Sequence, residues 1–298
     1  MPARLVFSED VMKRYLVLYN PLSEKGKGKE NAEKLTALFP GDEVTFTDMT
    51  AVDDLPALFR TTPANVTIIF TGGDGTLNRV LNLLDASKIA RPVLYYPAGT
   101  GNDFLNDLER DRSSKPFAIN EYLIGLPTVI VNGVSCKFIN GVGFGLEGFC
   151  CEESDRLKAL GKSKSYTMIA AEGLFGKYTP TNATVTVDGE TRTYRKVFMA
   201  PTMFGRFFGG GVKIAPRQDR KNPDHTVTTM IAHNISRLHA LLIFLSVVAG
   251  KGERYPKHLD YRTGHHVIVE FDRPTAMQID GETVKGVLKY EVIAAGKK

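Results

Sequence analysis

The residues best suited to chemistry in this sequence are one carboxylate, Asp74, and the three glycines around it. Residues 71–76 read TGGDGT and directly follow the apolar run VTIIF (66–70). A β-branched run that ends in glycines and opens into a helical pattern predicts a strand, a loop and a helix. Glycines lack Cβ atoms, so phosphate oxygens could approach backbone N–H groups at the positively polarised helix N-terminus. The segment therefore predicts a phosphate-binding loop.

Asp74 would repel a phosphate unless a cation lies between them. We therefore expect Asp74 to face a divalent cation that the phosphate also binds. The alternative is structural, with a tight strand-to-helix turn in which Asp74 caps the helix. The segment alone leaves both interpretations open.

Two further loops carry residues that could contact a nucleotide. Residues 20–28 read NPLSEKGKG, and residues 97–104 read PAGTGNDF, each after a short apolar run. Amides, hydroxyls and lysines of this kind can hydrogen-bond phosphate or sugar. Each loop also has a plainer interpretation, a solvated basic turn for the first and an Asn/Asp helix cap for the second. The first is not a Walker A loop, because GxxxxGK[ST] is not satisfied.

The elements around these loops predict a parallel sheet. Short apolar runs alternate with helical patterns from residue 15 to about 126; the runs are 15–20, 43–47, 66–70 and 93–97. Four such pairs predict a parallel sheet with helices on both faces. Ligands of these sheets bind at the carboxyl ends of the strands, where all three polar loops fall.

After about residue 127 the pattern changes to strands separated by turn signals, such as Asn132-Gly133 and Asp280-Gly281. This pattern predicts a second, mainly antiparallel domain. Helical stretches near 145–160, 164–176 and 235–250 interrupt it.

Bulk composition limits the class of protein. The 298 residues are 43% hydrophobic and 24% charged, which is typical of a soluble globular protein. The net charge of +5 fits an anionic partner, such as ATP or an acidic membrane surface. Three cysteines without zinc spacing and the short apolar run 238–249 indicate a cytosolic protein without a transmembrane segment. We expect no nucleic-acid partner, and a homodimer is one option for its assembly.

Five segments, in this order, resemble the diacylglycerol kinase/sphingosine kinase superfamily, and more specifically its small soluble bacterial lipid kinases. They are NPLS (20–23), TGGDGT (71–76), PAGTGNDF (97–104), GGGVKIAP (209–216) and IDGE (279–282). NAD kinases and phosphofructokinases share the glycine–aspartate motif, but its combination with GTGNDF and a late DGE is more specific. The resemblance covers nearly the whole chain after about residue 14.

The resemblance implies an N-terminal α/β nucleotide-binding domain, residues 1–126, and a C-terminal β-sandwich domain, residues 127–286, that covers the lipid site. Residues of about 287–298 would return to the first domain. ATP and Mg²⁺ are the implied cofactors, and the lipid would be reached by peripheral contact with a membrane surface. The positions that match the family's nucleotide contacts are Asn20, Pro21, Ser23, Lys25, Gly26, Thr47, Gly72, Gly73, Asp74, Gly75, Thr76 and Thr100.

The resemblance also implies that Glu282 is the catalytic base, with Asp74 organising the magnesium–ATP complex. A lipid hydroxyl is a poor nucleophile, and a nearby carboxylate could accept its proton during phosphoryl transfer. From the residues alone, Asp280-Gly281 would be a hairpin turn and Glu282 an exposed strand residue. Asp74 is the alternative base.

Two departures from the family pattern concern the loops between and within the domains. Glu24 replaces a glycine after NPLS, which would narrow the phosphate loop and add negative charge. Met203-Phe204 replace an Asn-Gly pair, so a polar contact between the domains would be lost. Phe204, Phe207 and Phe208 could line an acyl pocket or pack in the core.

A third departure affects a second, structural magnesium site. Bacterial relatives hold this ion through an aspartate and backbone carbonyls, and the matching groups here are Asp224 with the carbonyls of Lys221 and Thr226. The loop is longer than expected, and His225 replaces the glycine of an Asp-Gly pair. Asp219 is a rival ligand.

The leading hypothesis is an ATP- and magnesium-dependent lipid kinase that acts on diacylglycerol or a related lipid. The alternatives are an NAD kinase-like phosphotransferase and a nucleotide- or lipid-binding regulator without activity. The sequence does not choose among diacylglycerol, a sphingoid base, ceramide, a monoacylglycerol and phosphatidylglycerol as the acceptor.

Overall fold

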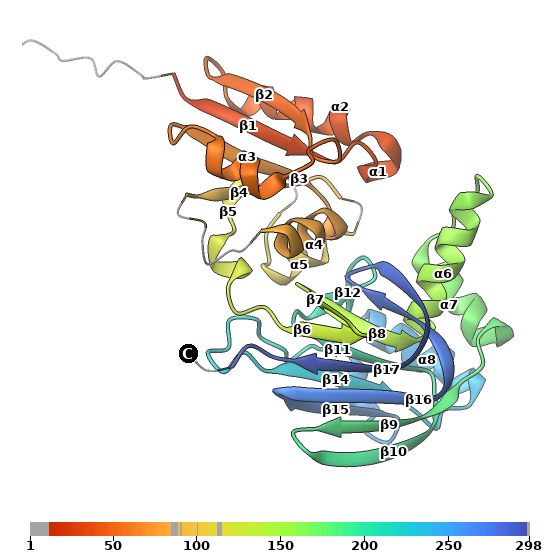
Figure 1. The fold of residues 1–298 in the computed structure, drawn as a ribbon. Helices are drawn as coiled ribbons and strands as arrows, with labels where there is room; N and C mark the ends of the chain where they lie inside the picture. The colour runs from red at the N-terminus through yellow and green to blue at the C-terminus, as the bar shows by residue number, and fades with distance from the viewer. Residues whose placement is uncertain (1–11, 85–88, 90, 100, 112–114, 297–298) are drawn as a thin grey trace, which may run out of the picture.

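Two domains follow one another along the chain in the computed structural model, which describes residues 12–84, 89, 91–99, 101–111 and 115–296 (Figure 1). The first domain contains a five-stranded sheet and the second a ten-stranded sheet. Among the described residues, every helix is too short or too polar to traverse a bilayer.

The first sheet has the predicted parallel arrangement. Its strands are β1 (Arg14–Tyr19), β2 (Glu43–Asp48), β3 (Val66–Gly72), β4 (Val93–Pro97) and β5 (Phe117–Ala118). Their order is β2-β1-β3-β4-β5; β1 to β4 are parallel, and β5 is antiparallel to β4. Tyr19 lies opposite both Asp48 and Thr71, so these strands end level at one edge.

Helices cover both faces of this sheet because successive strand residues point to opposite sides. The helices are α1 (Ser23–Gly26), α2 (Gly28–Glu33), η1 (Lys34–Leu38), α3 (Leu55–Thr61), α4 (Asp74–Leu83), α5 (Asp103–Asp107) and η3 (Asn120–Leu123). Ile68 and Phe70 share a core cluster with residues of α3 and α4. Ile69, between them, packs in a separate cluster with residues of α2 and η1.

The second sheet is antiparallel throughout. Its strands are β6 (Thr128–Val131), β7 (Val134–Lys137), β8 (Gly141–Gly145), β9 (Thr181–Val187), β10 (Glu190–Val197), β11 (Met199–Met203), β14 (Val227–Ala232), β15 (Leu259–Gly264), β16 (His266–Ile279) and β17 (Glu282–Ile293). The order is β15-β14-β11-β8-β16-β17-β6-β7, with β9 on β16 and β10 on β9. This confirms an α/β domain followed by a mainly antiparallel β domain with helices.

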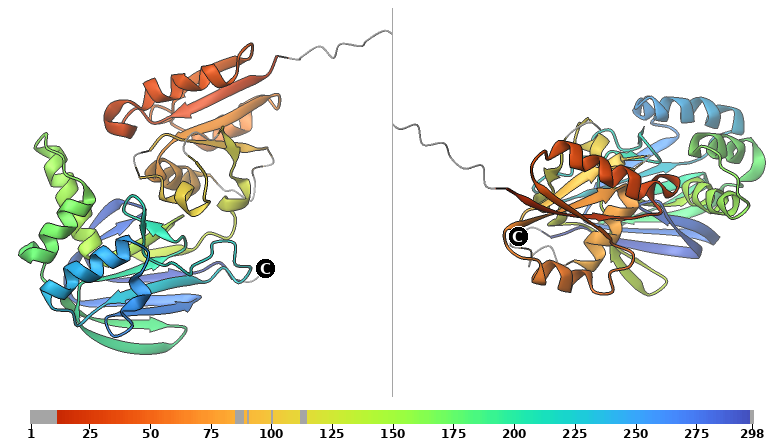
Figure 2. Two further views of the ribbon diagram at one scale, coloured as in Figure 1. Left: turned by 180° about the vertical axis from the view of Figure 1, so that it is seen from behind. Right: turned by 90° about the horizontal axis from the view of Figure 1, so that it is seen from above.

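The helices of the second domain gather on one side of it (Figure 2). They are α6 (Leu146–Ala159), α7 (Tyr166–Glu172), η4 (Gly173–Lys177), α8 (Arg237–Val248) and η5 (Gly252–Arg254). A separate two-stranded hairpin, β12 (Phe207–Phe208) with β13 (Val212–Lys213), contacts α5 of the first domain.

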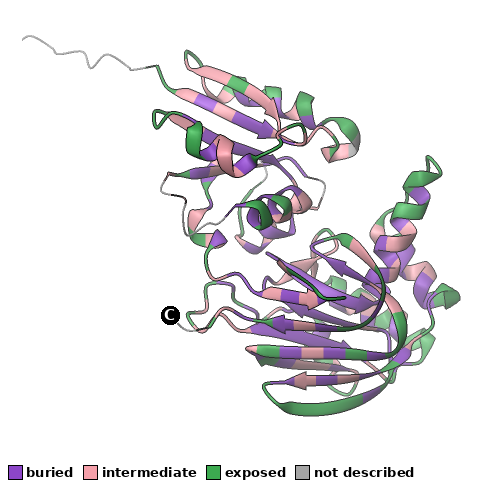
Figure 3. Ribbon diagram, in the orientation of Figure 1, coloured by how far each residue is buried: buried purple, intermediate pink, exposed green. Residues whose placement is uncertain are grey.

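The predicted return of residues 287–298 to the first domain is wrong for the residues that the structure describes. Residues 282–293 form β17, which pairs with β16 and β6 in the second sheet. Val287, Tyr290 and Val292 are completely buried there, and burial varies from residue to residue along the strand (Figure 3). These buried side chains stabilise the tail in the second domain.

Candidate active site

Three glycine-rich loops from different parts of the chain meet at the carboxyl end of the first sheet. A Cβ atom placed on Gly99, after β4, would lie 2.3 Å from the Cα of Gly73, after β3. A Cβ placed on Gly101 would lie 3.4 Å from the Cα of Gly210, in the turn between β12 and β13. The first of these contacts requires a residue without a side chain, and the second is an ordinary van der Waals contact. The glycines thus bring the two nucleotide loops and the second domain together.

The first backbone amides of α4 have no hydrogen-bond partner within the helix and could bind an anion. Gly73 is its N-cap, and the first helical hydrogen bond runs from Leu77 N to Gly73 O over 3.1 Å. The amides of residues 74–76 precede this bond, so they point out of the helix end. A Cβ on Gly72 would lie 2.3 Å from Oγ1 of Thr76, which is buried. The loop is therefore packed tightly against the helix, in a geometry suited to phosphate.

Asp74 caps α5, whereas the structural alternative in the sequence analysis expected it to cap the helix that follows it, α4. Its carboxylate accepts from the backbone N of Asp103 (2.9 Å) and of Phe104 (3.0 Å), the first residues of α5. The amide of Asn140, in the second domain, donates to the same carboxylate over 3.0 Å. Asn102, the N-cap of α5, instead accepts from Gly99 N. Asp74 therefore holds the two glycine loops and the second domain in place, and it remains half-exposed.

The first loop lies beside this helix end. Asn20 follows Tyr19, which pairs with Thr71, so Asn20 and Gly72 leave neighbouring strands at the same level. The carbonyl of Asn20 accepts from both N (3.1 Å) and Oγ (2.8 Å) of Ser23, which closes a tight turn around Pro21. Thr47 lies on β2 opposite Leu18, near the same edge.

Glu24 lies in the first loop with a positive φ and a side chain directed to α2. Its φ of 48° explains why a glycine suits this position. Its carboxylate accepts from the side-chain amide of Asn31 in α2. Gly26, with a φ of 90°, ends α1 and has open space around it. The side chain of Lys25 and the whole of Thr100, both expected to contact ATP, lie outside the described residues.

Glu282 lies above the N-terminus of α4. A Cβ atom placed on Gly75 would lie 3.2 Å from Oε1 of Glu282, so the carboxylate is directly beside the phosphate loop. Asp280-Gly281 form the two-residue turn between β16 and β17, with φ values of 45° and 93°, and Glu282 is an exposed strand residue. The hairpin interpretation and proximity to the loop therefore both hold.

Asp280 fixes the position of this hairpin. Its buried carboxylate accepts from the backbone N of Ile139 (2.6 Å), Asn140 (2.8 Å) and Gly141 (3.0 Å), and from Nδ2 of Asn78 (2.8 Å) in α4. The pKa of Asp280 is raised overall, because the effect of burial outweighs the lowering by these hydrogen bonds. The hairpin is thus attached to the helix that carries the phosphate loop.

Asp103 joins the loops to the β12–β13 hairpin. Its carboxylate accepts from the backbone N of Gly210 (3.0 Å) and Gly211 (2.6 Å). Burial, followed by the nearby charge of Asp74, raises the pKa of Asp103 to about 7. Gly209, Gly210 and Gly211 all have positive φ, so the GGG of the sequence motif forms this turn.

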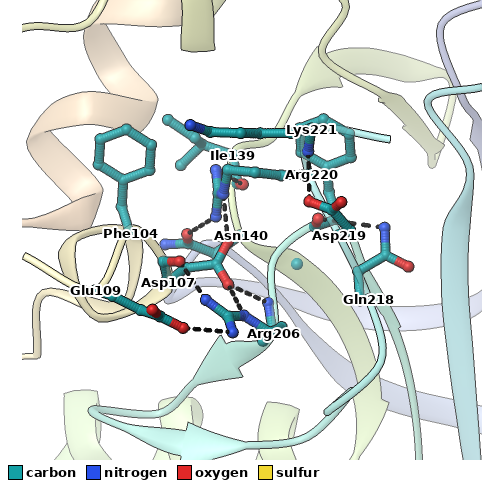
Figure 4. A network of polar contacts seen from close by, with 12 residues as sticks. Phe104, Asp107, Glu109, Ile139, Asn140, Arg206, Gln218, Asp219, Arg220 and Lys221 are labelled. Atoms are coloured by element: carbon teal, nitrogen blue, oxygen red, sulfur yellow. Dashed lines mark hydrogen bonds and ion pairs between the residues drawn. The ribbon is translucent and has the colours of Figure 1, made fainter. Parts of the chain in front are cut away.

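A buried ionic network connects the domains next to the site (Figure 4). Arg220 of the second domain donates to Asp107 of α5, to the carbonyl of Ile139 (3.1 Å) and to Oδ1 of Asn140 (3.2 Å). Arg206 also donates to Asp107 from N and Nε. The Arg220 guanidinium lies 5.8 Å from the Phe204 ring centroid, so a polar contact between the domains is present beside the Met203-Phe204 departure.

Two of the groups expected around a second, structural magnesium accept hydrogen bonds from the protein. The carbonyl of Thr226 accepts from Gln218, the carbonyl of Asp224 accepts from His265, and Asp219 accepts from the backbone N of Lys221. Arg220 already supplies a buried positive charge in this loop. The described part of the chain contains no cluster of three or more His, Cys, Asp or Glu side chains suited to a metal. The expected site uses one aspartate and two carbonyls, and a carbonyl that accepts one hydrogen bond keeps a second lone pair, so the structural magnesium stays a prediction.

An apolar cavity lies inside the second domain, next to the site. Its lining residues come mainly from α6, α7, α8 and the sheet, and include Phe208 and Gly209 of the β12–β13 hairpin. Because Gly210 and Gly211 of that hairpin bind Asp103, the cavity and the phosphate loops share one wall. Glu147 also lines the cavity; within the described residues, neither of its carboxyl oxygens has a hydrogen-bond partner. Burial raises its pKa well above the usual value.

Sequence reasoning missed several functional side chains in this arrangement. Asn140, Asp107 and Arg220 connect the domains, but none lies in a recognisable motif. The late DGE motif singled out the position of Asp280. Its role as a buried acceptor could not be predicted, because it depends on amides 140 residues away along the chain. The only sequence indication for Glu147 is that it is a single acid within an apolar stretch.

Two protein families match consecutive parts of the chain. The diacylglycerol kinase catalytic domain matches residues 14–130, and the YegS C-terminal NAD kinase beta sandwich-like domain matches residues 140–292.

Individual proteins give a consistent result. A diacylglycerol kinase of Bacillus subtilis is 28% identical over 282 residues, which cover 91% of this chain and 90% of that protein. Human diacylglycerol kinase iota is 32% identical over 103 residues, 34% of this chain and 10% of its own length. The crystal structure of a diacylglycerol kinase from Bacillus anthracis matches with a TM-score of 0.57 and 17% identity, and covers 96% of this chain and 95% of that one. This last likeness concerns the fold.

Proposed function

The chain belongs to the family of small bacterial lipid kinases with a diacylglycerol kinase catalytic domain, and from this premise we propose that it transfers the γ-phosphate of ATP to a hydroxyl of diacylglycerol or a related lipid. The observation that carries this proposal is the contact between Glu282 and Gly75. It places a carboxylate from the second domain at the N-terminus of α4, where phosphate would bind.

The backbone amides of residues 74–76 would bind the phosphates of ATP, helped by the dipole of α4. Glu282 would accept the proton of the lipid hydroxyl. The hydroxyl oxygen then forms a bond to the γ-phosphorus, the bond from that phosphorus to the bridging oxygen of ADP breaks, and ADP leaves.

Asp74 fits a magnesium ion that is shared with the nucleotide. Its carboxylate accepts three hydrogen bonds and is half-exposed, so it retains acceptor capacity toward the loops. Magnesium is commonly held by one or two carboxylates together with substrate phosphates, and it would neutralise charge on the transferred group. Asp74 would also keep the loop after β4 against the loop after β3.

The apolar cavity is the proposed site for the hydrocarbon part of the acceptor. Phe208, Leu146, Ile243 and Met230 are among the side chains that line it. A lipid chain in this cavity would have its polar end near the β12–β13 hairpin, and the Asp103–Asp74 contacts lead from there to α4. This arrangement favours a lipid acceptor reached at a membrane surface over a fully polar acceptor.

The test is phosphate transfer from labelled ATP, with magnesium, to a lipid panel and to NAD. We expect labelled product with diacylglycerol or another hydroxyl-bearing lipid. Transfer to NAD alone would contradict the lipid kinase proposal, and retained ATP binding without any transfer would indicate an inactive regulator.

A further inference from the structure

Helix α8 exposes a stripe of large apolar side chains. Leu238, Leu242 and Leu245 are 75%, 53% and 56% exposed. The spacing of four and three residues places them on one face of the helix. Soluble proteins rarely leave contiguous apolar surface of this kind uncovered without a function.

The opposite face of the same helix forms a wall of the apolar cavity. Ala240, Ile243 and Val247 are buried and line that cavity. One helix thus separates the proposed acyl site from the exterior, and it is apolar on both sides.

Neighbouring segments also expose large apolar side chains. Arg237 at the start of α8 donates to the carbonyls of Leu174 (2.9 Å) and Tyr178 (3.2 Å), which fastens α8 to η4. Phe175 of η4 is 72% exposed, and Met168 of α7 is 56% exposed. We name the outer side of α7, η4 and α8, with these two residues and the three leucines, the apolar face.

The chain segments around the apolar face are strongly basic. Residues 156–177 and 233–258 together hold nine Lys and Arg but only two acidic residues, Glu172 and Glu253. Four of these basic residues are in ion pairs: Arg156 with Glu153 and Lys158 with Asp155, both acids just before the counted range, and Lys164 and Lys177 with Glu172. Glu253 pairs with Arg217. Because the whole chain has a net charge of only +5, the rest of it is slightly acidic. Among the described residues, the basic side chains of these segments without an acidic partner are Lys162, Arg237, Lys251, Arg254 and Lys257, and they supply the positive charge beside the apolar face.

We propose that the apolar face is the surface by which this protein docks on an anionic lipid bilayer. Apolar side chains enter the boundary between headgroups and acyl chains, while lysines and arginines attract anionic headgroups. A second copy of the chain is a poorer occupant, because a two-fold contact would bring the same basic segments together. The inference rests on the proposed lipid kinase function, and it places the cavity wall at the membrane.

Vesicle co-sedimentation of the full chain tests this inference. The vesicles contain phosphatidylcholine alone or with phosphatidylserine, and the variants are Leu238→Glu/Leu242→Glu and Lys162→Glu/Lys251→Glu. Leu288→Glu is the matched control, since this leucine is 47% exposed on β17. We expect binding to be stronger with phosphatidylserine, and at least ~10-fold weaker in both double variants. The control should bind like the wild type.

Wild-type-like binding by the leucine double variant would overturn the proposal. So would a wild-type dimer in solution that this variant converts to a monomer, because the apolar face would then be a protein interface.

A second assay separates docking from catalysis. With a short-chain diacylglycerol dispersed in detergent, the leucine double variant should keep the wild-type turnover, because Leu238 and Leu242 do not line the cavity. If the wild type binds vesicles through the apolar face but phosphorylates no lipid, the lipid kinase function fails while the docking surface stands.

Discussion

Arg220 and Asp107 form a buried ion pair where the two domains meet. Nε of Arg220 donates to Oδ2 of Asp107, and the two residues are only 8% and 7% exposed. Burial raises the pKa of Asp107, but the charge of Arg220 and the hydrogen bonds from both arginines lower it overall. The pair holds the C-terminal end of α5. Because the N-terminal amides of α5 donate to Asp74, the pair also helps to position the active site.

Removing Arg220 should destabilise the protein strongly. Arg220→Met leaves Asp107 buried with a single arginine partner, Arg206, and loss of one partner of a buried ion pair typically costs about 3–5 kcal/mol. Arg217→Met is the matched control, because its ion pair with Glu253 is on the surface and should contribute roughly 0–1 kcal/mol. Denaturant unfolding measures both. Equal losses in the two variants would contradict the role of the buried pair.

Asp74→Asn should lower turnover by ~100- to 1000-fold, the scale for loss of one important electrostatic contact in a catalytic site. The domain structure should persist, because the single oxygen of asparagine can still accept from one of the two α5 amides. Asp54→Ala serves as control: Asp54 caps α3 through Ala57 N and is not among the predicted nucleotide contacts. Its loss should cost about 1 kcal/mol of stability without changing turnover. Near-normal turnover of Asp74→Asn would leave Asp74 with only a structural role.

Gly73→Val should weaken ATP binding. A Cβ atom at this position would lie 3.0 Å from the Cα of Gly99, so the valine would push the two nucleotide loops apart and occupy the space for phosphate. Isothermal titration with ATP and magnesium measures the effect. Gly296→Val is the control, since its Cβ would meet nothing within 4 Å. Unchanged ATP affinity in a folded Gly73→Val variant would refute the phosphate-loop assignment.

Glu147 should make stability depend on pH. Burial raises its pKa in the folded protein, so its protonated form is the one that folding favours. Its contribution to stability is fully present below the ordinary glutamate pKa and is lost as pH rises toward the raised value. Glu147→Gln should therefore be more stable than the wild type at pH 8, by about 1 kcal/mol or more, with the difference shrinking near pH 4. A pH-independent difference would contradict this account.

The first domain could be predicted closely because each of its main strands is a short apolar run in the sequence. The apolar runs 66–70 and 93–97 lie within β3 and β4 as observed, and the glycine loops follow them. The late hairpin was predicted for the same reason, since Asp-Gly favours a two-residue turn.

Other features could not be predicted, because they depend on contacts between distant segments. β8 reads GVGFG, which resembles a loop, yet every residue of it is buried. A Cβ on Gly143 would lie 2.1 Å from Oε1 of Glu147 in α6, and a Cβ on Gly141 would lie 2.6 Å from the sulfur of Met203 in β11, so neighbours from distant segments explain these glycines. Arg220 lies in a polar loop, RQDRKNPDH, and is buried only because partners from α5 and from the segment before β8 surround it.

The central claim is that Glu282 accepts the proton of the lipid hydroxyl, and single-turnover phosphoryl transfer by Glu282→Gln tests it most directly. Glutamine keeps the size of the side chain but cannot accept the proton, so transfer should slow by roughly 100-fold or more while ATP and lipid still bind. Glu291→Gln, on the same strand, should transfer at the wild-type rate. If Glu282→Gln retains most of its rate in this chemical step, Glu282 is not the base, and Asp74 becomes the first alternative.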